Sequence, residues 1–155
     1  MKYIVLGTTA FTKHLAQAII DSEETMSLLI TLDDNLLPDN STNFELFCNK
    51  HNIKLFKTSD INKKSTCELI KAENPDFIIS SWPKILNKNI LEIPKYFTVG
   101  THPTFLPQNK GRHPLHWIIA LGVKNSALSF FIMDEGIDSG EILLQKSFVN
   151  NNKPI

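Results

Sequence analysis

Short apolar runs alternate with amphipathic stretches along most of the chain. The apolar runs predict strands at residues 3–6, 27–32, 53–57, 77–80, 97–99, 127–133 and 142–148. The stretches between them repeat their apolar positions every three to four residues, which predicts helices at residues 11–21, 44–51, 65–72, 87–91 and 114–121. The helix at 65–72 is expected to stop before Asn74-Pro75, because a residue that precedes proline avoids helical geometry.

This alternation of strands and helices predicts an α/β fold. We expect a Rossmann-like, mostly parallel sheet with helices on both of its faces. The last two predicted strands are joined by a short loop, so they should form an antiparallel pair near the C-terminus. A chain of 155 residues is long enough to bury one core, so residues 1–155 are predicted to form a single domain.

Composition narrows the class of partner. Sixteen basic and sixteen acidic residues cancel, so the chain lacks the one-sided positive surface of most nucleic-acid-binding proteins. No apolar stretch has the length of a membrane span, and the N-terminus enters a strand without a signal-peptide pattern. We therefore expect a cytoplasmic protein with a small-molecule substrate and without a nucleic-acid or membrane partner. The oligomeric state stays open.

One histidine and one aspartate form the leading candidate site. His102 follows the apolar run that ends at Val99, and Asp138 lies in a Gly/Ser turn after the run that ends at Met133. Open α/β sheets assemble active sites from loops at strand ends, so the two side chains are expected to meet. A histidine beside a carboxylate offers a proton acceptor together with a group that orients it.

The first predicted strand is followed by Gly7-Thr8-Thr9, a position at which many α/β proteins bind a nucleotide. A dinucleotide fingerprint needs three glycines and this turn has one, so no nicotinamide or flavin cofactor is expected. Thr8 and Thr9 could receive an anionic group at the helix start, or they could simply cap the helix. The sequence leaves both roles open.

Three further features carry weaker signals. His102, His113 and His116 could form a zinc site with Asp138, but His116 can equally pack at the margin of the core, and no metal is expected. Arg112 could bind a phosphate or carboxylate, although a solvated arginine is commoner. The apolar loop at residues 82–86 could hold a flat heteroaromatic ligand or pack on the sheet edge.

Several ordered motifs resemble the formyltransferase domain. They are His-Pro-Thr-x-Leu-Pro at 102–107, Gly-Arg at 111–112, Pro-Leu-His-Trp at 114–117 and Met-Asp-Glu-Gly-Ile-Asp-Ser-Gly at 133–140. Methionyl-tRNA formyltransferase, phosphoribosylglycinamide formyltransferase and the sugar-nucleotide N-formyltransferases share this domain. The resemblance runs from about residue 3 to residue 148, and several motifs in a consistent order make it specific.

The resemblance implies transfer of a formyl group from 10-formyltetrahydrofolate to a primary amine. By the same resemblance, His102 and Asp138 match the catalytic histidine and aspartate. The positions implied to hold the formyl donor are Trp82, Lys84, Ile85, Leu86, Ile137, Ser139 and Gly140. The expected acceptor contacts are Thr8, Thr9, Arg112 and His113. We expect an amine on a small metabolite, preferably an amino-sugar nucleotide, rather than a transfer RNA.

One position departs from the family pattern, since Gly100 stands where the family has asparagine. That asparagine is implied to donate a hydrogen bond to an oxyanion, and loss of one such donor typically costs ~10²–10³ in rate. Thr101, our first candidate, Thr104, a backbone N–H or a water could take the role. Otherwise the protein is a slow or inactive folate- or nucleotide-binding module.

Two further alternatives accompany this interpretation. Hydrolysis of formyl-tetrahydrofolate would use water in place of the amine, and a metal-dependent hydrolase is the least favoured reading. The family usually continues beyond the length of this chain with more strand and helix. The sequence is therefore expected to be either a truncated chain or a minimal catalytic domain.

Overall fold

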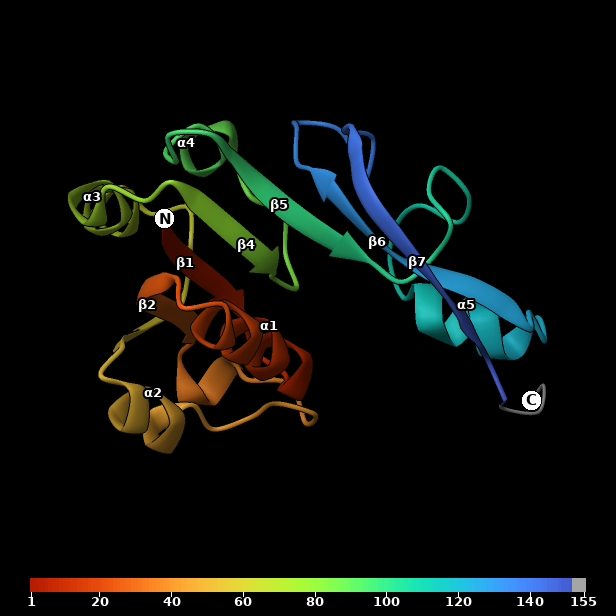
Figure 1. The fold of residues 1–155 in the computed structure, drawn as a ribbon, viewed down its shortest axis with the longest axis horizontal. Coiled ribbons are helices and arrows are strands. Elements are labelled where there is room, and N and C mark those ends of the chain that lie inside the picture. Colours follow the sequence, from red (N-terminus) through yellow and green to blue (C-terminus); the bar gives the residue numbers. More distant parts are fainter. Residues whose placement is uncertain (152–155) are drawn as a thin grey trace. The chain divides into compact units, whose positions relative to one another are not determined.

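A computed structural model describes residues 1–151 (Figure 1). Seven strands and five α-helices, with one 3₁₀-helix, follow one another in these residues. In chain order they are β1 (Lys2–Gly7), α1 (Ala10–Asp21), β2 (Thr25–Leu32), η1 (Asp34–Leu36), α2 (Glu45–His51), β3 (Lys54–Thr58), α3 (Lys64–Glu73), β4 (Phe77–Ser81), α4 (Lys88–Leu91), β5 (Phe97–His102), α5 (Pro114–Ala120), β6 (Asn125–Ile132) and β7 (Ile142–Val149).

The strands form one sheet in the order β3-β2-β1-β4-β5-β6-β7. β1 pairs in parallel with β2 and with β4, and β2 pairs in parallel with β3. β5 and β6 are antiparallel, as are β6 and β7. The predicted Rossmann-like, mostly parallel sheet with an antiparallel pair near the C-terminus is therefore confirmed. The antiparallel pairing also includes β5, which the sequence did not indicate.

Two element boundaries differ from the prediction in ways that matter. β5 was expected to end at Val99, but it continues to His102 because Gly100 and Thr101 pair with Phe131 and Phe130 of β6. The candidate histidine is therefore the last residue of a strand rather than a loop residue. The turn expected after β2 also contains one turn of 3₁₀-helix, η1.

The chain divides into two compact units, Met1–Thr98 and Val99–Ile155, which we call unit 1 and unit 2. The single domain expected from the sequence stays a prediction, and residues 152–155 of it lie outside the described residues. No helix in residues 1–151 is both long enough and apolar enough to cross a membrane.

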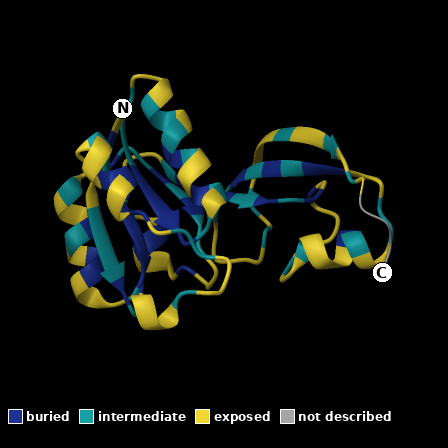
Figure 2. Cartoon of the chain, turned by 90° about the horizontal axis from the view of Figure 1, so that it is seen from below, coloured by how far each residue is buried: buried dark blue, intermediate teal, exposed yellow. Residues whose placement is uncertain are grey.

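One face of the unit 1 sheet is covered by α1 and α2. Val5 and Leu29 lie opposite each other on β1 and β2, so both side chains point to the same face. They pack in one buried cluster with Ala16 of α1 and Phe47 and Cys48 of α2. Figure 2 shows this arrangement as strands that are mostly buried beneath helices with exposed outer faces. The buried stripe of each helix explains its amphipathic pattern in the sequence.

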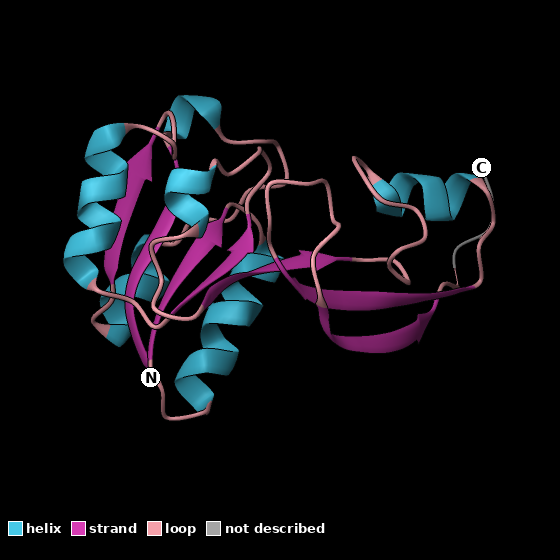
Figure 3. Ribbon diagram, turned by 90° about the horizontal axis from the view of Figure 1, so that it is seen from above, coloured by secondary structure: helices cyan, strands magenta, loops and turns pink. Residues whose placement is uncertain are grey.

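The opposite face of the same sheet belongs to α3 and α4. The chain adds β2 and β3 on one side of β1, and then returns to place β4 on the other side of β1. Because crossovers between parallel strands are right-handed, α3 must lie on the face of the sheet opposite α1 and α2. Ile4 and Ile78 point to this second face and are fully buried, as is Ile70 of α3. Figure 3 shows helices on both sides of these strands.

Two helices in unit 1 end where the sequence allows a left-handed residue. Asn52 follows α2 with a φ of 55°, and Asn74 follows α3 with a φ of 48°. Asparagine tolerates this conformation better than most residues, and it closes helices for that reason. The chain leaves α3 at Asn74-Pro75, as the proline predicted.

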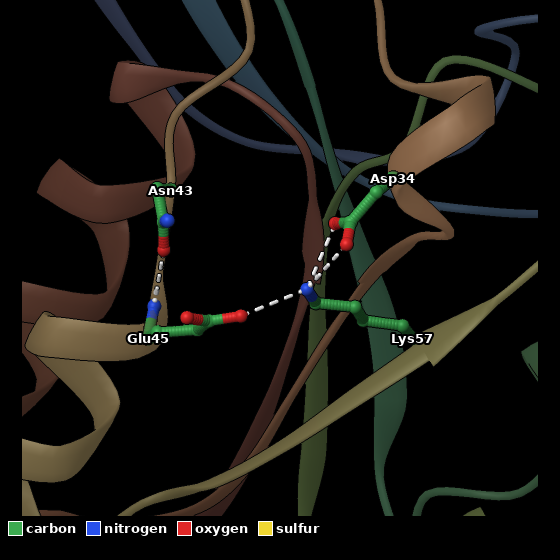
Figure 4. A network of polar contacts seen from close by, with 4 residues as sticks. All are labelled: Asp34, Asn43, Glu45 and Lys57. Atoms are coloured by element: carbon green, nitrogen blue, oxygen red, sulfur yellow. Dashed lines mark hydrogen bonds and ion pairs between the residues drawn. The ribbon is translucent and has the colours of Figure 1, made fainter.

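A surface network joins β3, η1 and α2 in unit 1 (Figure 4). The Lys57 ammonium donates to the Asp34 and Glu45 carboxylates, at 2.8 Å to Asp34 Oδ1 and 2.9 Å to Glu45 Oε1. Its hydrogen bond to Asp34, and then that to Glu45, raise the pKa of the Lys57 ammonium. The Asn43 side chain accepts from the Glu45 N–H at the start of α2. Exposed pairs of this kind contribute little to stability.

Unit 2 is built on the β6–β7 hairpin, against which the segment after β5 is held by a buried serine. Ser129 of β6 is fully buried and its hydroxyl donates to the Thr104 carbonyl. The same hydroxyl accepts from the Leu106 N–H and from Nε2 of Gln145 on β7. These bonds satisfy backbone polar groups in the segment that follows β5, so the chain can turn there without leaving those groups unpaired.

Candidate active site

His102 sits at the carboxyl end of β5, in unit 2. It lies opposite Ser129 in the β5–β6 pair, and only 5% of the residue is exposed. Because side chains alternate along a strand, Gly100 and His102 share one face of β5 and Thr101 points to the other. The strand therefore fixes the direction of the imidazole more firmly than a loop would.

Asp138 lies in the loop between β6 and β7, which is ordered by its own polar contacts. Oδ1 of Asp134 accepts from the Gly136 N–H at 2.9 Å and from the Ser139 hydroxyl at 2.8 Å. A Cβ atom on Gly140 would lie 1.6 Å from the Ile132 carbonyl oxygen, so only glycine fits there. Asp138 adopts a left-handed φ of 48° in this loop.

The structure brings the two candidate side chains together. Nδ1 of His102 lies 3.4 Å from Oδ2 of Asp138, and the same carboxylate oxygen accepts from the Gly111 N–H at 2.8 Å. Nε2 of His102 lies 2.8 Å from the Asn109 carbonyl oxygen. A carbonyl can only accept, so Nε2 carries a proton in this arrangement. A ring protonated on both nitrogens donates to Asn109 and Asp138 at once.

Thr101 and Thr104 were considered as hydrogen-bond donors in place of the family asparagine, and the structure favours neither of them. Thr101 pairs with Phe130 on the face of β5 opposite His102, so we do not retain the catalytic role predicted for it. Thr104 is fully buried and its hydroxyl already donates to the Gln108 carbonyl at 2.7 Å. The strand alternation that excludes Thr101 could not be applied while β5 was expected to end at Val99.

The place of the missing asparagine side chain is filled by apolar atoms. A Cβ atom on Gly100 would lie 2.7 Å from Cζ of Phe131 and 2.8 Å from Cγ of Met133. Phe131 lies directly opposite Gly100 in the β5–β6 pair and is 3% exposed. Any side chain at position 100 would therefore require Phe131 and Met133 to shift.

The positions expected to hold the formyl donor lie in two loops. In unit 1, the loop after β4 is tied down by Asn62, whose amide donates to the Ile85 carbonyl and accepts from the Asn87 N–H. Ile85 is 76% exposed, whereas Leu86 is buried. The indole Nε1 of Trp82 is buried without a hydrogen-bond partner among residues 1–151.

The remaining positions expected to hold the formyl donor are divided between the same two loops. Lys84 is exposed beside Ile85 in unit 1. Ile137, Ser139 and Gly140 belong to the β6–β7 loop of unit 2, where Ile137 is 66% exposed. Each loop thus exposes one large apolar side chain, Ile85 in unit 1 and Ile137 in unit 2.

Thr8 and Thr9 were left open between anion binding and helix capping, and their contacts favour capping. Thr9 is the N-cap residue of α1, and its N–H donates to Oγ1 of Thr12. Thr8 is 1% exposed. Oγ1 of Thr12 also pairs with Oγ of Ser81 at 2.8 Å, in the space that a side chain on Gly7 would need. Hydroxyl groups of the protein thus fill this turn, and we do not carry Thr8 and Thr9 into the acceptor site.

Arg112 and His113 lie in the loop between β5 and α5 of unit 2. A cavity of about 240 Å³ opens beside Arg112, lined by Asn109, Lys110, Arg112, Pro114, Trp117 and Leu121. His113 caps α5 in a left-handed conformation, and its ring meets that of His116 edge to face, with 5.5 Å between their centroids. Within residues 1–151, no group of three or more His, Cys, Asp or Glu side chains could hold a metal ion.

Sequence reasoning missed the backbone groups that contact the candidate pair. The Asn109 carbonyl and the Gly111 N–H come from a short turn whose side chains carry no obvious chemistry. The only signal was the presence of Asn and Gly, which favour left-handed turns. That signal locates a turn but does not show what its backbone contacts.

The comparison with related sequences shows the family. The family described as "Formyl transferase" matches residues 1–149. Methionyl-tRNA formyltransferase of Thermodesulfovibrio yellowstonii is 32% identical over 158 residues, which cover 97% of this chain and 50% of the relative. The enzyme of the same name from Clostridium botulinum is 31% identical over 153 residues, with 94% and 49% covered. The chain thus spans about half the length of the curated relatives it matches.

Solved structures support the fold. Phosphoribosylglycinamide formyltransferase from Bacillus halodurans superposes with a TM-score of 0.80 at 20% identity, covering all of this chain and 83% of that one. A formyltetrahydrofolate deformylase from Pseudomonas syringae superposes with a TM-score of 0.76 at 16% identity, covering 96% and 51%. The ordered motifs, the fold and the match over residues 1–149 together show that the chain belongs to the formyl transferase family.

Proposed function

We propose that this protein transfers a formyl group from 10-formyltetrahydrofolate to a primary amine. The observation that carries the proposal is the 3.4 Å approach of His102 Nδ1 to Asp138 Oδ2 in a chain of the formyl transferase family. A buried imidazole beside a carboxylate is a suitable arrangement for moving a proton during acyl transfer.

The loop after β4 supports binding of the formyl donor. The Trp82 indole N–H is buried without an acceptor among residues 1–151, and an unpaired buried donor is costly unless a ligand satisfies it. A pterin ring offers carbonyl and ring-nitrogen acceptors on a flat apolar body. Exposed Ile85 in the same loop supplies apolar surface for such a ring.

The reaction forms one bond from the amine nitrogen to the formyl carbon and breaks the bond from that carbon to N10 of the folate. One proton leaves the amine and one proton is delivered to N10, so no oxidant or metal is needed for balance. Both ring nitrogens of His102 are engaged by the Asn109 carbonyl and by Asp138, so a protonated His102 would stabilise the negative charge that develops on the formyl oxygen through the positive charge of its ring. Asp138 would hold the ring in orientation and balance its positive charge.

Gly100 shapes the expected rate of this chemistry. With Phe131 and Met133 in the space beside Gly100, no side chain at position 100 can contribute a hydrogen bond. The charge on the formyl oxygen must then be stabilised by the His102 ring, a backbone N–H or a water. We expect measurable but slow transfer, because one fixed donor typically contributes ~10²–10³ in rate.

The proposal also concerns the molecule that bears the acceptor amine. An amino-sugar nucleotide is the preferred acceptor, since its phosphates could meet Arg112 and Lys110 at the 240 Å³ cavity in unit 2. The curated relatives are named methionyl-tRNA formyltransferases, which makes an aminoacyl-tRNA the second candidate.

A single assay separates these possibilities. The chain is incubated with 10-formyltetrahydrofolate and, in separate reactions, with amino-sugar nucleotides, phosphoribosylglycinamide, methionyl-tRNA or no amine. Amine-dependent donor consumption with a formylated product of the expected mass supports the proposal and identifies the acceptor. Formate release without an amine would indicate a hydrolase, and calorimetric folate binding without turnover would indicate a binding module. Either result would overturn transfer.

A further inference from the structure

The turn formed by Asn109, Lys110 and Gly111 has an unusual backbone. Asn109 has a φ of 54° and Gly111 a φ of 98°, so two of its three residues lie in the left-handed region. Glycine enters this region freely and asparagine more easily than other residues with a side chain. The two left-handed residues turn the backbone so that a carbonyl and an N–H, two residues apart, both point to one side.

Those two backbone groups contact the two members of the candidate pair. The Asn109 carbonyl accepts from Nε2 of His102 at 2.8 Å, and the Gly111 N–H donates to Oδ2 of Asp138 at 2.8 Å. The bond to Asn109 requires a proton on Nε2, and Nδ1 then faces the Asp138 carboxylate, to which it donates when the ring is protonated on both nitrogens. The bond from Gly111 holds the oxygen that Nδ1 faces.

We propose that the turn Asn109–Gly111 is a positioning element that sets the tautomer of His102 and the place of the Asp138 carboxylate through its backbone. This inference rests on the proposed function, because the pair that the turn holds is the proposed catalytic pair. Asn109 and Gly111 are thus positioning residues. The conformation of their backbone matters and the chemistry of their side chains does not.

The surroundings of the turn allow a clean test of this claim. Asn109 is exposed, and a Cβ atom on Gly111 would meet no atom within 4 Å. Substitutions at either position therefore change backbone preference without colliding with the core. Asn109→Gly and Asn109→Val both remove the amide side chain, but glycine accepts a left-handed φ and valine strongly resists it. Gly111→Ala strains the φ of 98° in the same way.

The first readout is turnover. We expect Asn109→Val and Gly111→Ala each to lower kcat about tenfold to a hundredfold while KM for the formyl donor changes less than threefold, because small misplacements of reacting groups are costly. Asn109→Gly should retain a kcat at least about threefold above that of Asn109→Val, because glycine accepts the left-handed φ. Thermal unfolding of each variant shows that the fold is kept. Equal kcat values for Asn109→Gly and Asn109→Val would overturn the proposal.

The second readout needs no turnover. Nitrogen-15 NMR of the His102 ring, assigned by comparison with His102→Asn, reports which nitrogen carries the proton in the neutral ring. We expect protonated Nε2 in the parent protein and in Asn109→Gly, and a mixture of tautomers in Asn109→Val. Protonated Nδ1 in the parent protein, or an unchanged ring in Asn109→Val, would contradict the positioning role. Absence of formyl transfer in the parent protein would instead remove the proposed function and leave this measurement valid.

Discussion

Gly100 and Phe131 lie opposite each other on β5 and β6, and a Cβ atom on Gly100 would come within 2.7 Å of the Phe131 ring. Real Cβ atoms do not approach other heavy atoms so closely. The aromatic ring therefore occupies the position that an asparagine side chain would need, next to His102 on the same face of β5. The glycine at position 100 and the ring opposite it thus belong to one packing arrangement.

We predict that Gly100→Ala lowers the free energy of unfolding by about 1–3 kcal/mol, the usual cost of an added group in a filled site. Urea denaturation measures this. The same substitution in a Phe131→Leu background should cost clearly less, because the smaller side chain yields space. An identical cost in both backgrounds would show that Phe131 is not the obstacle. Gly100→Asn alone should not raise the rate of formyl transfer.

Removal of either member of the candidate pair should abolish most turnover. His102→Asn and Asp138→Asn are each expected to lower kcat by ~10²–10⁴, the range for a positioned acid or base. The double variant should be little worse than either single variant, because the two groups act as a unit. His116→Asn is the matched control, since it makes the same change at an exposed ring. Near-normal turnover in His102→Asn or Asp138→Asn would refute the assignment.

Ser129→Ala should destabilise unit 2. The hydroxyl has three partners, so its loss leaves buried polar groups of Thr104, Leu106 and Gln145 with fewer bonds. We expect a loss of about 1–3 kcal/mol in the free energy of unfolding, measured by chemical denaturation. Ser22→Ala, which removes one exposed hydrogen bond, should change stability by less than about 0.5 kcal/mol. Comparable effects of the two substitutions would count against the network.

The buried thiol of Cys48 should make the folded protein less stable at alkaline pH. Burial raises the pKa of its thiol from 9.0 to about 11, because the thiolate is poorly solvated in the core of unit 1. Between these two pH values the thiol of the unfolded chain loses its proton, whereas the thiol of the folded chain keeps it. The contribution of the buried thiol to the free energy of unfolding is therefore intact below about pH 9 and is lost as the pH rises toward 11. Denaturation midpoints measured from pH 8 to 11 should fall more steeply for the parent protein than for Cys48→Ala. Parallel curves would refute the shift.

The sequence predicted the fold well because periodicity is a local property. Strands such as β2 and helices such as α1 are visible from the spacing of apolar residues, and their alternation determines a mostly parallel sheet. The predicted end of β5 was wrong because Gly100 has weak strand propensity and interrupts the apolar run. Gly100 and Thr101 extend the strand only because β6 supplies hydrogen-bond partners from a distant part of the chain.

The candidate site was predictable in its chemistry and not in its surroundings. His102 and Asp138 were identifiable because histidine and aspartate have few rivals for proton transfer and because the motifs around them resemble one family. The face of β5 on which Thr101 lies could not be predicted, because it depends on the register with β6. The contact between Thr9 and Thr12 at the start of α1 favours a capping role for Thr9.

By itself, the order of residues determined that this chain forms an α/β sheet and carries a histidine and a carboxylate at two strand ends. Only the tertiary structure decided that Nδ1 of His102 faces Asp138, that Phe131 fills the space at Gly100, and that the backbone of Asn109 and Gly111 contacts the pair. Local pattern encodes which elements form, because propensity and periodicity act over a few residues. Contacts between atoms far apart in the chain depend on register and packing, which exist only once the whole sheet has formed.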